Sequence, residues 1–240
     1  MTRVKAARPI RAILFDKDGT LVDFQGTWGP AVHAVMQALA AGRRATYQRL
    51  AAASGFVECE LRFRPDSPLI AQPTNVWGLL WAEALGCEAD AHFLADVDRR
   101  LCEETTLHLV PIGEPQKLMT ALAGCGYRLG VASNDAEMTV SAHARKLGID
   151  RILQFVAGYD SGFGAKPDPG PILAFAKAVG VSPSQVAVVG DTALDVAAAR
   201  AAGAIAVGVL TGPESAATLV PDADAILASA EELPTWLDQH

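Results

Sequence analysis

This sequence contains no long segments of uniformly apolar or uniformly basic residues. No stretch approaches the ~20 uninterrupted apolar residues that a membrane-spanning helix needs, so we expect no membrane partner. A basic N-terminal segment runs from Arg3 to Arg11, but Pro9 and Asp16 bracket an apolar run too short for a signal peptide. Asp and Glu (27) outnumber Lys and Arg (20), and the net charge of −7 argues against the clustered basic surface of a nucleic-acid-binding protein.

Cysteine is also scarce. The four cysteines, at positions 59, 87, 102 and 125, form no Cys-x-x-Cys pair, and no His pair has metal-binding spacing. This pattern predicts free thiols, buried or half-buried, in a reducing compartment. We therefore expect a soluble cytoplasmic protein.

The sequence does contain enough apolar residues for a sizeable core. Half of its 240 residues are hydrophobic, which suits one large domain or a domain with a smaller insert. Short apolar runs predict strands at Ala12–Phe15, Arg128–Ser133, Gln154–Ala157, Gln185–Gly190, Ala204–Gly208 and Ala225–Leu227. Helical patterns lie between them at Glu114–Gly124, Ala136–Leu147, Gly170–Val179, Leu194–Ala202 and Glu231–Leu237. This alternation predicts an α/β fold, with a parallel sheet covered by helices on both faces.

The segment from Phe24 to Leu109 differs, because it shows helical spacing and no convincing strand. Gly29-Pro30 is predicted to open one helix, with the proline near its first turn. Two more helices are expected at Thr74–Leu85 and Ala89–Glu104, and a loop at Arg64–Pro73. The predicted organisation is a core domain formed by residues 1–23 and 110–240, with a helical domain inserted at 24–109.

Asp16-Lys17-Asp18-Gly19-Thr20 follows the first predicted strand directly. Side chains two apart on an extended segment point the same way, so Asp16 and Asp18 can face one small volume. Two like charges held that close need a divalent cation, a shared proton or an anionic substrate bound through a metal.

Polar residues follow three other segments of the predicted sheet domain. They are Ser133-Asn134-Asp135, Lys166 in a Gly- and Pro-rich loop, and Gly190-Asp191 with Asp195 four residues beyond. In an open α/β sheet the ligand crevice lies outside the carboxyl ends of the strands, so these residues can converge there with Asp16.

The residue types form a coherent chemical set. Asp16 and Asp191 supply the oxygen ligands that Mg²⁺ prefers, and Lys166 is a point charge suited to a phosphate. Ser133, Asn134 and neighbouring backbone N–H groups can donate to phosphoryl oxygens. One carboxylate can then attack phosphorus, while a second protonates the leaving oxygen and later activates water.

These four motifs, in this order, resemble those of the haloacid dehalogenase superfamily, and the resemblance spans the whole chain. It implies a Rossmann-like core with an inserted helical cap. Asp16 then matches the nucleophile, and Asp18 matches the general acid/base that also gives a backbone carbonyl to the metal. Ser133 and Lys166 match the phosphoryl-binding positions. Further implied positions are Asp191 as the remaining carboxylate ligand of Mg²⁺ and Thr20, Gly190 and Asp195 in supporting roles.

Asp18 also favours one reaction class within this superfamily. The dehalogenase members lack the second Asp, so its presence points to phosphoryl chemistry. The insert resembles the cap of the phosphoglycolate phosphatase-like branch, which implies a small phosphate ester similar to phosphoglycolate as substrate. The resemblance thus implies a Mg²⁺-dependent phosphatase with an aspartyl-phosphate intermediate. A phosphomutase, a nucleotide phosphatase and a non-catalytic phosphate-binding or regulatory protein stay open, as do a monomer and a homodimer.

Structural explanations compete with some of the site roles. Ser133-Asn134 can cap the helix that follows, and Asp195 can act only on the dipole of its own helix. The position between the two motif acids is more often apolar in the superfamily, so the role of Lys17 is open.

Within the insert, Trp77 and Trp81 share one helix face, which favours core packing over substrate stacking. Phe24 and Trp28 follow the first motif and can line the crevice. Arg62 and Arg64 can meet an anionic substrate tail, although a solvated pair is the simpler interpretation.

Overall fold

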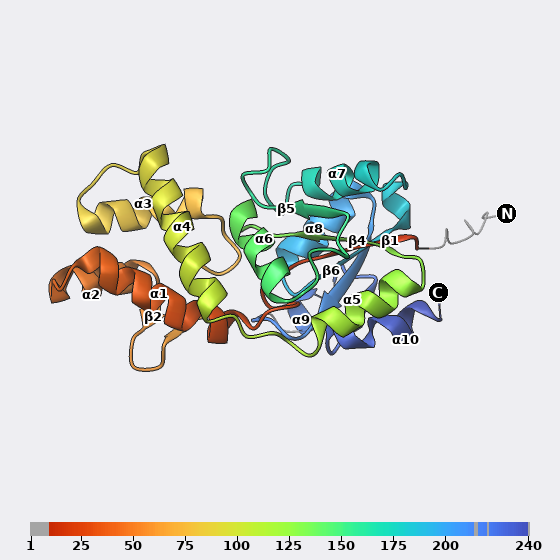
Figure 1. Cartoon of the computed structure of the whole chain (residues 1–240), viewed down its shortest axis with the longest axis horizontal. Coiled ribbons are helices and arrows are strands. Elements are labelled where there is room, and N and C mark those ends of the chain that lie inside the picture. Colours follow the sequence, from red (N-terminus) through yellow and green to blue (C-terminus); the bar gives the residue numbers. More distant parts are fainter. Residues whose placement is uncertain (1–9, 214–215, 220, 240) are drawn as a thin grey trace.

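A six-stranded parallel sheet lies at the centre of the chain, with strand order β5-β4-β1-β6-β7-β8 (Figure 1). The computed structural model describes residues 10–213, 216–219 and 221–239, so the basic residues from Arg3 to Arg8, and His240, lie outside the described part. The strands match the predicted ones within one or two residues: β1 (Ala12–Phe15), β4 (Arg128–Ala132), β5 (Phe155–Ala157), β6 (Val186–Gly190), β7 (Ile205–Val209) and β8 (Ala225–Leu227).

Helices cover both faces of this sheet, as predicted. Ile13 and Phe15 of β1 face a cluster that includes residues of α5, α6 and α10, while Ala12 and Leu14 face one that includes residues of α7, α8 and α9. The strands are therefore apolar without alternation, since each side chain finds a buried face. The helices are α5 (Pro115–Gly124), α6 (Glu137–Lys146), α7 (Gly170–Ala178), α8 (Ala193–Ala202), α9 (Ala216–Leu219) and α10 (Leu233–Leu237), with 3₁₀ turns at Pro183–Gln185 and Ala230–Glu232.

The inserted segment packs around a hydrophobic cluster of its own and forms the left-hand part of Figure 1. Trp77 and Trp81 are buried in that cluster with ring centroids 5.1 Å apart, which confirms their predicted packing role. We refer to this segment as the cap; its limits at residues 24 and 109 stay a prediction. Its helices are α1 (Phe24–Ala40), α2 (Arg44–Ala53), α3 (Thr74–Leu85) and α4 (Ala91–Leu107).

The cap differs from the predictions in three ways. A short antiparallel ribbon, β2 (Phe56–Val57) with β3 (Arg62–Phe63), is present although no strand was expected, because two-residue strands carry no alternation to detect. Helix α2 was not predicted. Helix α1 begins at Phe24 and not at Gly29-Pro30, because the Asp23 carboxylate caps it by accepting from the Gly26 N–H at 2.5 Å.

Gly29 has a packing role instead. A Cβ at this position would lie 1.8 Å from the Leu61 carbonyl oxygen, so only glycine lets the ribbon approach α1 this closely. The interior Pro30 was therefore a misleading signal of a helix start.

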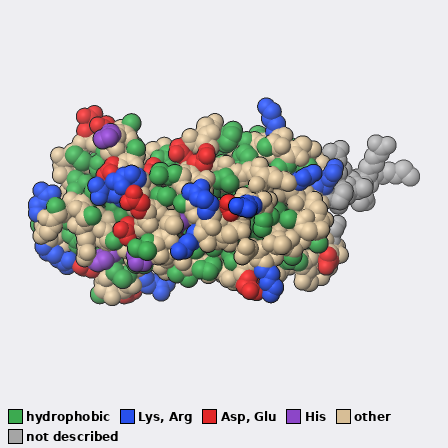
Figure 2. All heavy atoms as spheres, in the orientation of Figure 1, with side chains coloured by type: hydrophobic (Ala, Val, Ile, Leu, Met, Phe, Trp, Pro, Cys, Tyr) green, Lys and Arg blue, Asp and Glu red, His purple; other side chains and the backbone are tan. Residues whose placement is uncertain are grey.

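The cysteines and the surface complete the comparison with the sequence predictions. All four cysteines are free, but Cys59, Cys87 and Cys125 are exposed and only Cys102 is buried, which corrects the expected burial. Within the described part of the chain, no helix is long and apolar enough to cross a membrane. On the face shown in Figure 2, basic and acidic side chains lie interspersed over both the cap and the core.

Candidate active site

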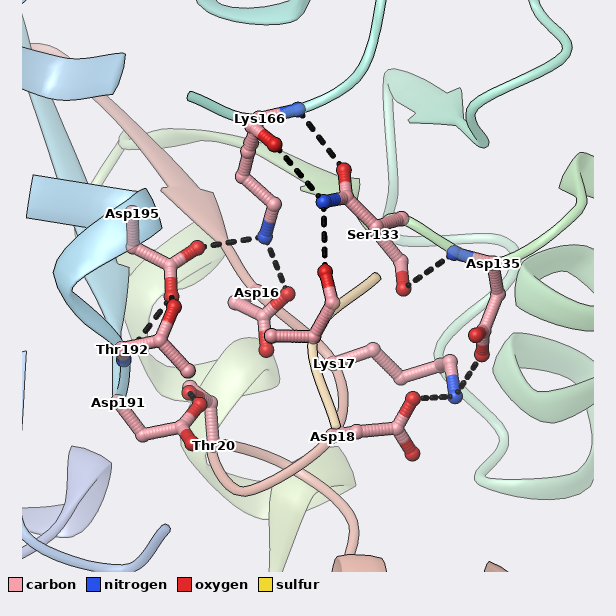
Figure 3. A network of polar contacts seen from close by, with 12 residues as sticks. Asp16, Lys17, Asp18, Thr20, Ser133, Asp135, Lys166, Asp191, Thr192 and Asp195 are labelled. Atoms are coloured by element: carbon pink, nitrogen blue, oxygen red, sulfur yellow. Dashed lines mark hydrogen bonds and ion pairs between the residues drawn. The ribbon is translucent and has the colours of Figure 1, made fainter. Parts of the chain in front are cut away.

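The carboxyl ends of three neighbouring strands lie level with one another, on the side of the sheet that faces the cap. Phe15, the last residue of β1, pairs with Val131 of β4 and with Val189 of β6. The residues that follow these ends, among them Asp16, Ser133 and Asp191, line one pocket together with Lys166. The convergence predicted from the strand ends is thus confirmed, and Figure 3 shows these side chains around a common centre.

Lys166 joins two of the acids. Its ammonium group forms ion pairs with Asp16 Oδ1 and, at 2.5 Å, with Asp195 Oδ1, and all three side chains are buried. Burial alone would lower the pKa of Lys166, but the two carboxylates raise it above its ordinary value. Burial raises the pKa of Asp16 to about 6. The Lys166 ammonium group opposes this rise, and the Asp195 carboxylate adds to it.

Asp195 has two structural tasks. Besides binding Lys166, it accepts hydrogen bonds through Oδ2 from the Thr192 N–H at 3.1 Å and from Thr192 Oγ1 at 2.7 Å, which closes a capping box at the start of α8. A Cβ at Gly190 would lie 2.3 Å from Asp195 Cγ, so glycine makes room for this carboxylate. The helix-start interpretation and the site interpretation of Asp195 are therefore compatible.

Asp191 is enclosed by the loop that carries the first motif. Thr20 Oγ1 donates to Asp191 Oδ1 at 3.0 Å. Gly19 adopts a φ of +80°, and a Cβ there would lie 2.1 Å from Asp191 Oδ2, so this turn requires glycine on two counts. Burial and the neighbouring Asp16 raise the pKa of Asp191 well above its ordinary value.

The carboxylate cluster fits a divalent cation. Among the described residues, one group of potential ligands gathers here: oxygens of Asp16, Asp191 and Asp195 lie within 4.8 Å of one another. Both Asp195 oxygens are already bonded, which leaves Asp16 and Asp191 as the better donors. A single buried lysine beside several carboxyl groups leaves an excess of negative charge that a cation would relieve. The Asp18 carboxylate is not part of this group.

Asp18 belongs to a second, adjacent network (Figure 3). Lys17, which is 2% exposed, contacts Asp18 Oδ2 and lies 2.8 Å from Asp135 Oδ2. Trp28 of the cap donates from Nε1 to Asp18 Oδ1 at 2.9 Å. Burial would raise the pKa of Asp18, but Lys17 lowers it below its ordinary value. Lys17 thus lies beside the pocket wall and holds Asp18 in place. This contact gives Lys17 the role that the sequence left open.

Among the acids of this network, Asp135 is the one whose surroundings most disfavour the ionised form. Burial, opposed by Lys17 and reinforced by Asp18, raises its pKa from 3.8 to about 8. Between these values the folded protein keeps a proton that the unfolded chain has released. The stability that this group contributes is therefore fully present below about pH 4 and is lost as the pH rises to about 8.

Replacing Asp135 with Asn should remove this pH dependence. In metal-free protein, we expect the free energy of unfolding of the wild type to fall, relative to Asp135→Asn, as the pH rises from about 5 to about 8. Urea unfolding at several pH values measures the difference. The exposed Asp150→Asn variant is the control and should run parallel to the wild type. Parallel curves for Asp135→Asn as well would show that Asp135 is ionised throughout this range.

The Ser133-Asn134 pair does not cap α6. The N-cap residue of that helix is Ala136, with no side-chain cap, which rules out the capping alternative. Ser133 Oγ accepts from the Asp135 N–H at 3.1 Å. The Asn134 amide accepts from the Lys166 N–H at 2.8 Å and donates to the Lys166 and Ala71 carbonyls, both at 2.9 Å. Its observed role is to fix the Lys166 backbone, so only its main chain is free for a phosphate.

The cap closes the other side of the pocket. Phe24 lines it as predicted, together with the loop residues Leu69, Ile70, Ala71 and Gln72. Sequence reasoning assigned these four to an unremarkable loop, and no local pattern marks them. Trp28 reaches the site through its hydrogen bond to Asp18 and is not among the lining residues.

Helix α4 of the cap packs against α6 of the core. Buried His143 lies with its Nε2 3.0 Å from Thr105 Oγ1, and burial lowers the pKa of His143 to about 3, so the ring is neutral. The Tyr159 hydroxyl donates to Asp98 of α4 at 2.7 Å. These contacts hold the cap over the strand ends.

The chain is similar in sequence and fold to several known proteins. A family model described as haloacid dehalogenase-like hydrolase matches residues 10–203. The phosphoglycolate phosphatase of Chromobacterium violaceum is 30% identical over 213 residues, which is 89% of this chain and 90% of that protein. That of Colwellia psychrerythraea is 28% identical over 204 residues, 83% and 84% of the two chains. The crystal structure of a predicted phosphoglycolate phosphatase from Haemophilus somnus superposes with a TM-score of 0.71 at 19% identity, covering 95% of this chain and 97% of that one.

Proposed function

The chain belongs to the haloacid dehalogenase-like hydrolases, and from that premise we propose that it is a Mg²⁺-dependent phosphatase of a small phosphate monoester, acting through an aspartyl-phosphate on Asp16. One observation carries the proposal. Asp16 lies at the base of a cap-covered pocket, paired with Lys166 and beside Asp191, while Asp18 lines the same pocket from two residues away.

Asp16 is the proposed nucleophile. Lys166 binds its Oδ1, which keeps the carboxylate ionised and leaves Oδ2 to attack phosphorus as the bond to the leaving oxygen breaks. The ammonium group also offsets the repulsion between this carboxylate and the phosphoryl group. Ser133 Oγ and the main-chain N–H of Asn134 are the proposed donors to the phosphoryl oxygens.

Asp18 is the proposed proton carrier. Since Lys17 keeps Asp18 ionised in the free protein, the proton that Asp18 passes to the leaving oxygen in the first step arrives with the substrate, bound as the phosphate monoanion. In the second step the resulting carboxylate takes a proton from the water that attacks phosphorus, which releases phosphate and restores Asp16. Lys17 and Trp28 fix its two oxygens and so set the direction of the carboxyl group.

Asp16 and Asp191 are the proposed side-chain ligands of Mg²⁺, with the main-chain carbonyl of Asp18 as a further one implied by the family resemblance. The bound cation would neutralise negative charge on the phosphoryl group. Asp195, Thr20 and Gly190 support these ligands: Asp195 through Lys166, Thr20 through Asp191, and Gly190 by leaving space.

A panel of phosphate esters tests the function. The purified protein with Mg²⁺ should release inorganic phosphate from some members of a panel of phosphorylated acids, sugars, alcohols and nucleotides. Release of phosphate also separates hydrolysis from transfer to a second hydroxyl, which a phosphomutase would perform. Absence of release from every ester would contradict the proposal.

Removal of the metal should abolish this activity. We expect EDTA to reduce phosphate release to background and added Mg²⁺ to restore it, because Asp16 and Asp191 otherwise repel the substrate phosphate. Mg²⁺ alone should also raise the unfolding temperature, since a cation that binds only the folded state stabilises it. Undiminished turnover in EDTA, or an unchanged unfolding temperature, would contradict the metal assignment.

The cytoplasmic location expected from the cysteine pattern stays a prediction.

A further inference from the structure

The pocket has two ends of different character. The proposed phosphoryl end holds the carboxyl groups and Lys166. The opposite end, called the leaving-group end here, is formed by the cap residues that line the pocket, Phe24, Leu69, Ile70, Ala71 and Gln72. These side chains are apolar except for the Gln72 amide, so among the residues that the structure describes no charged side chain belongs to this end.

The walls of the leaving-group end are held in place. The ring of Phe24 lies 5.9 Å from that of Trp28 and 5.3 Å from that of Phe63, between centroids. Ala71 adopts a φ of +63°, and its carbonyl accepts from Asn134 Nδ2 at 2.9 Å, which ties the loop to the catalytic side. The apolar surface is thus a fixed feature of the site.

No lysine or arginine of the cap lines this end. Its sequence contains no lysine between residues 24 and 109. Among the described residues, no arginine lines the pocket. Arg62 lines a neighbouring groove that shares Phe24 and Ile70 with this end and also contains Asp23 and Glu60. The other cap arginines bind elsewhere: Arg44 to Glu58, Arg64 to Asp66, Arg99 and Arg100 to Asp96, Arg43 to the Ala40 carbonyl and Arg49 to the Ala84 carbonyl.

A second negative charge on the substrate would therefore be unpaired. Five carboxyl groups line the pocket (Asp16, Asp18, Asp135, Asp191 and Asp195) against the ammonium group of Lys166 in the lining and that of Lys17 beside it. A carboxylate placed inside the pocket beside Leu69 and Gln72 would lose its hydration without gaining a counter-ion from the pocket lining and would be repelled by these acids.

We propose that the leaving group of the natural substrate is a small uncharged alcohol. Its carbon skeleton packs against Phe24, Leu69 and Ile70, and a free hydroxyl group binds the Gln72 amide. This inference rests on the proposed phosphatase function, and it separates this chain in substrate choice from the relatives named phosphoglycolate phosphatase.

Two esters that differ only at the distal carbon test the inference. 2-Hydroxyethyl phosphate and 2-phosphoglycolate have the same two-carbon skeleton, ending in a hydroxymethyl group and a carboxylate respectively. With Mg²⁺, we expect kcat/KM to be about tenfold or more higher for 2-hydroxyethyl phosphate, with the difference mainly in KM. Equal values, or a preference for 2-phosphoglycolate, would overturn the inference while leaving the phosphatase function intact.

Charge-changing variants show whether the leaving-group end is responsible. The variant Gln72→Arg, at an exposed position, should improve kcat/KM for 2-phosphoglycolate about tenfold relative to that for 2-hydroxyethyl phosphate. Gln48→Arg, which makes the same change on the exposed face of α2, should leave the ratio unaltered. Arg62→Gln should also leave it unaltered. A selective loss of 2-phosphoglycolate turnover in Arg62→Gln would show that an anionic tail reaches the neighbouring groove, contrary to the inference.

Binding of unreactive sulfonates separates this inference from the proposed function. Calorimetry of the Mg²⁺-loaded protein can compare 2-hydroxyethanesulfonate with sulfoacetate, which carry the same two distal groups. Tighter binding of 2-hydroxyethanesulfonate supports the inference, and tighter binding of sulfoacetate overturns it. If no phosphate ester is hydrolysed, the phosphatase proposal fails, and this comparison still decides what the leaving-group end prefers.

Discussion

An Asp16→Asn variant is expected to lose about 10⁴-fold or more of its turnover while remaining folded. The amide has nearly the shape of the carboxylate but cannot attack phosphorus. Burial already raises the pKa of Asp16 to about 6, so a neutral group at this position removes like-charge repulsion with Asp191 and Asp195. The unfolding temperature of the metal-free variant should therefore equal or exceed that of the wild type.

Steady-state phosphate release and thermal unfolding measure both parts of this prediction. The matched control is Asp150→Asn, the same substitution at an exposed position, which should keep wild-type turnover. An Asp16→Ala variant guards against slow deamidation of the introduced Asn. Turnover within tenfold of the wild type in both Asp16 variants would rule out this residue as the nucleophile.

A Lys17→Met variant is expected to lose about 3–5 kcal/mol of unfolding free energy, because breaking a buried ion pair leaves uncompensated charge in the interior. Lys17 is 2% exposed and binds both Asp18 and Asp135. Its loss also frees Asp18 from one of its two fixed contacts, so turnover of alkyl phosphates, whose leaving group needs a proton, should fall more than that of nitrophenyl phosphate.

Urea unfolding gives the stability change, and Lys146→Met, at an exposed position on α6, is the control that should change little. The double variant Lys17→Met/Asp135→Asn should recover part of the lost stability, since it removes a carboxyl group that the lysine had paired. Wild-type stability in Lys17→Met would show that the buried ammonium group contributes nothing net. An equal loss of turnover on both ester types would show that Lys17 does not act through Asp18.

The core was predictable because its signals are local. Each strand is a short apolar run that packs on both faces, and each motif begins where such a run ends, as for Asp16 after β1 and Asp191 after β6. Parallel strands bring these ends together whatever their distance along the chain. The predicted core fold and the predicted phosphoryl-binding set both derive from this rule.

What could not be predicted depends on contacts between distant segments. The partners of Lys17 include Asp135, more than a hundred residues away, and Trp28 reaches Asp18 from the cap. Asn134 shows the same limit: its position suggested a phosphate ligand, whereas its amide is bonded to the Lys166 and Ala71 backbone. The leaving-group end is formed by a loop without regular periodicity, so no pattern pointed to it.

Trapping the covalent intermediate tests the central claim most directly. Protein quenched during turnover with Mg²⁺ and a good ester is reduced with borohydride, which converts an aspartyl-phosphate to homoserine, and the modified position is read by peptide mass spectrometry. We predict homoserine at position 16, formed only when both ester and Mg²⁺ are present and absent from Asp16→Asn. Homoserine at Asp18 or Asp191, or no modification at any carboxyl group during active turnover, would contradict the nucleophilic role of Asp16.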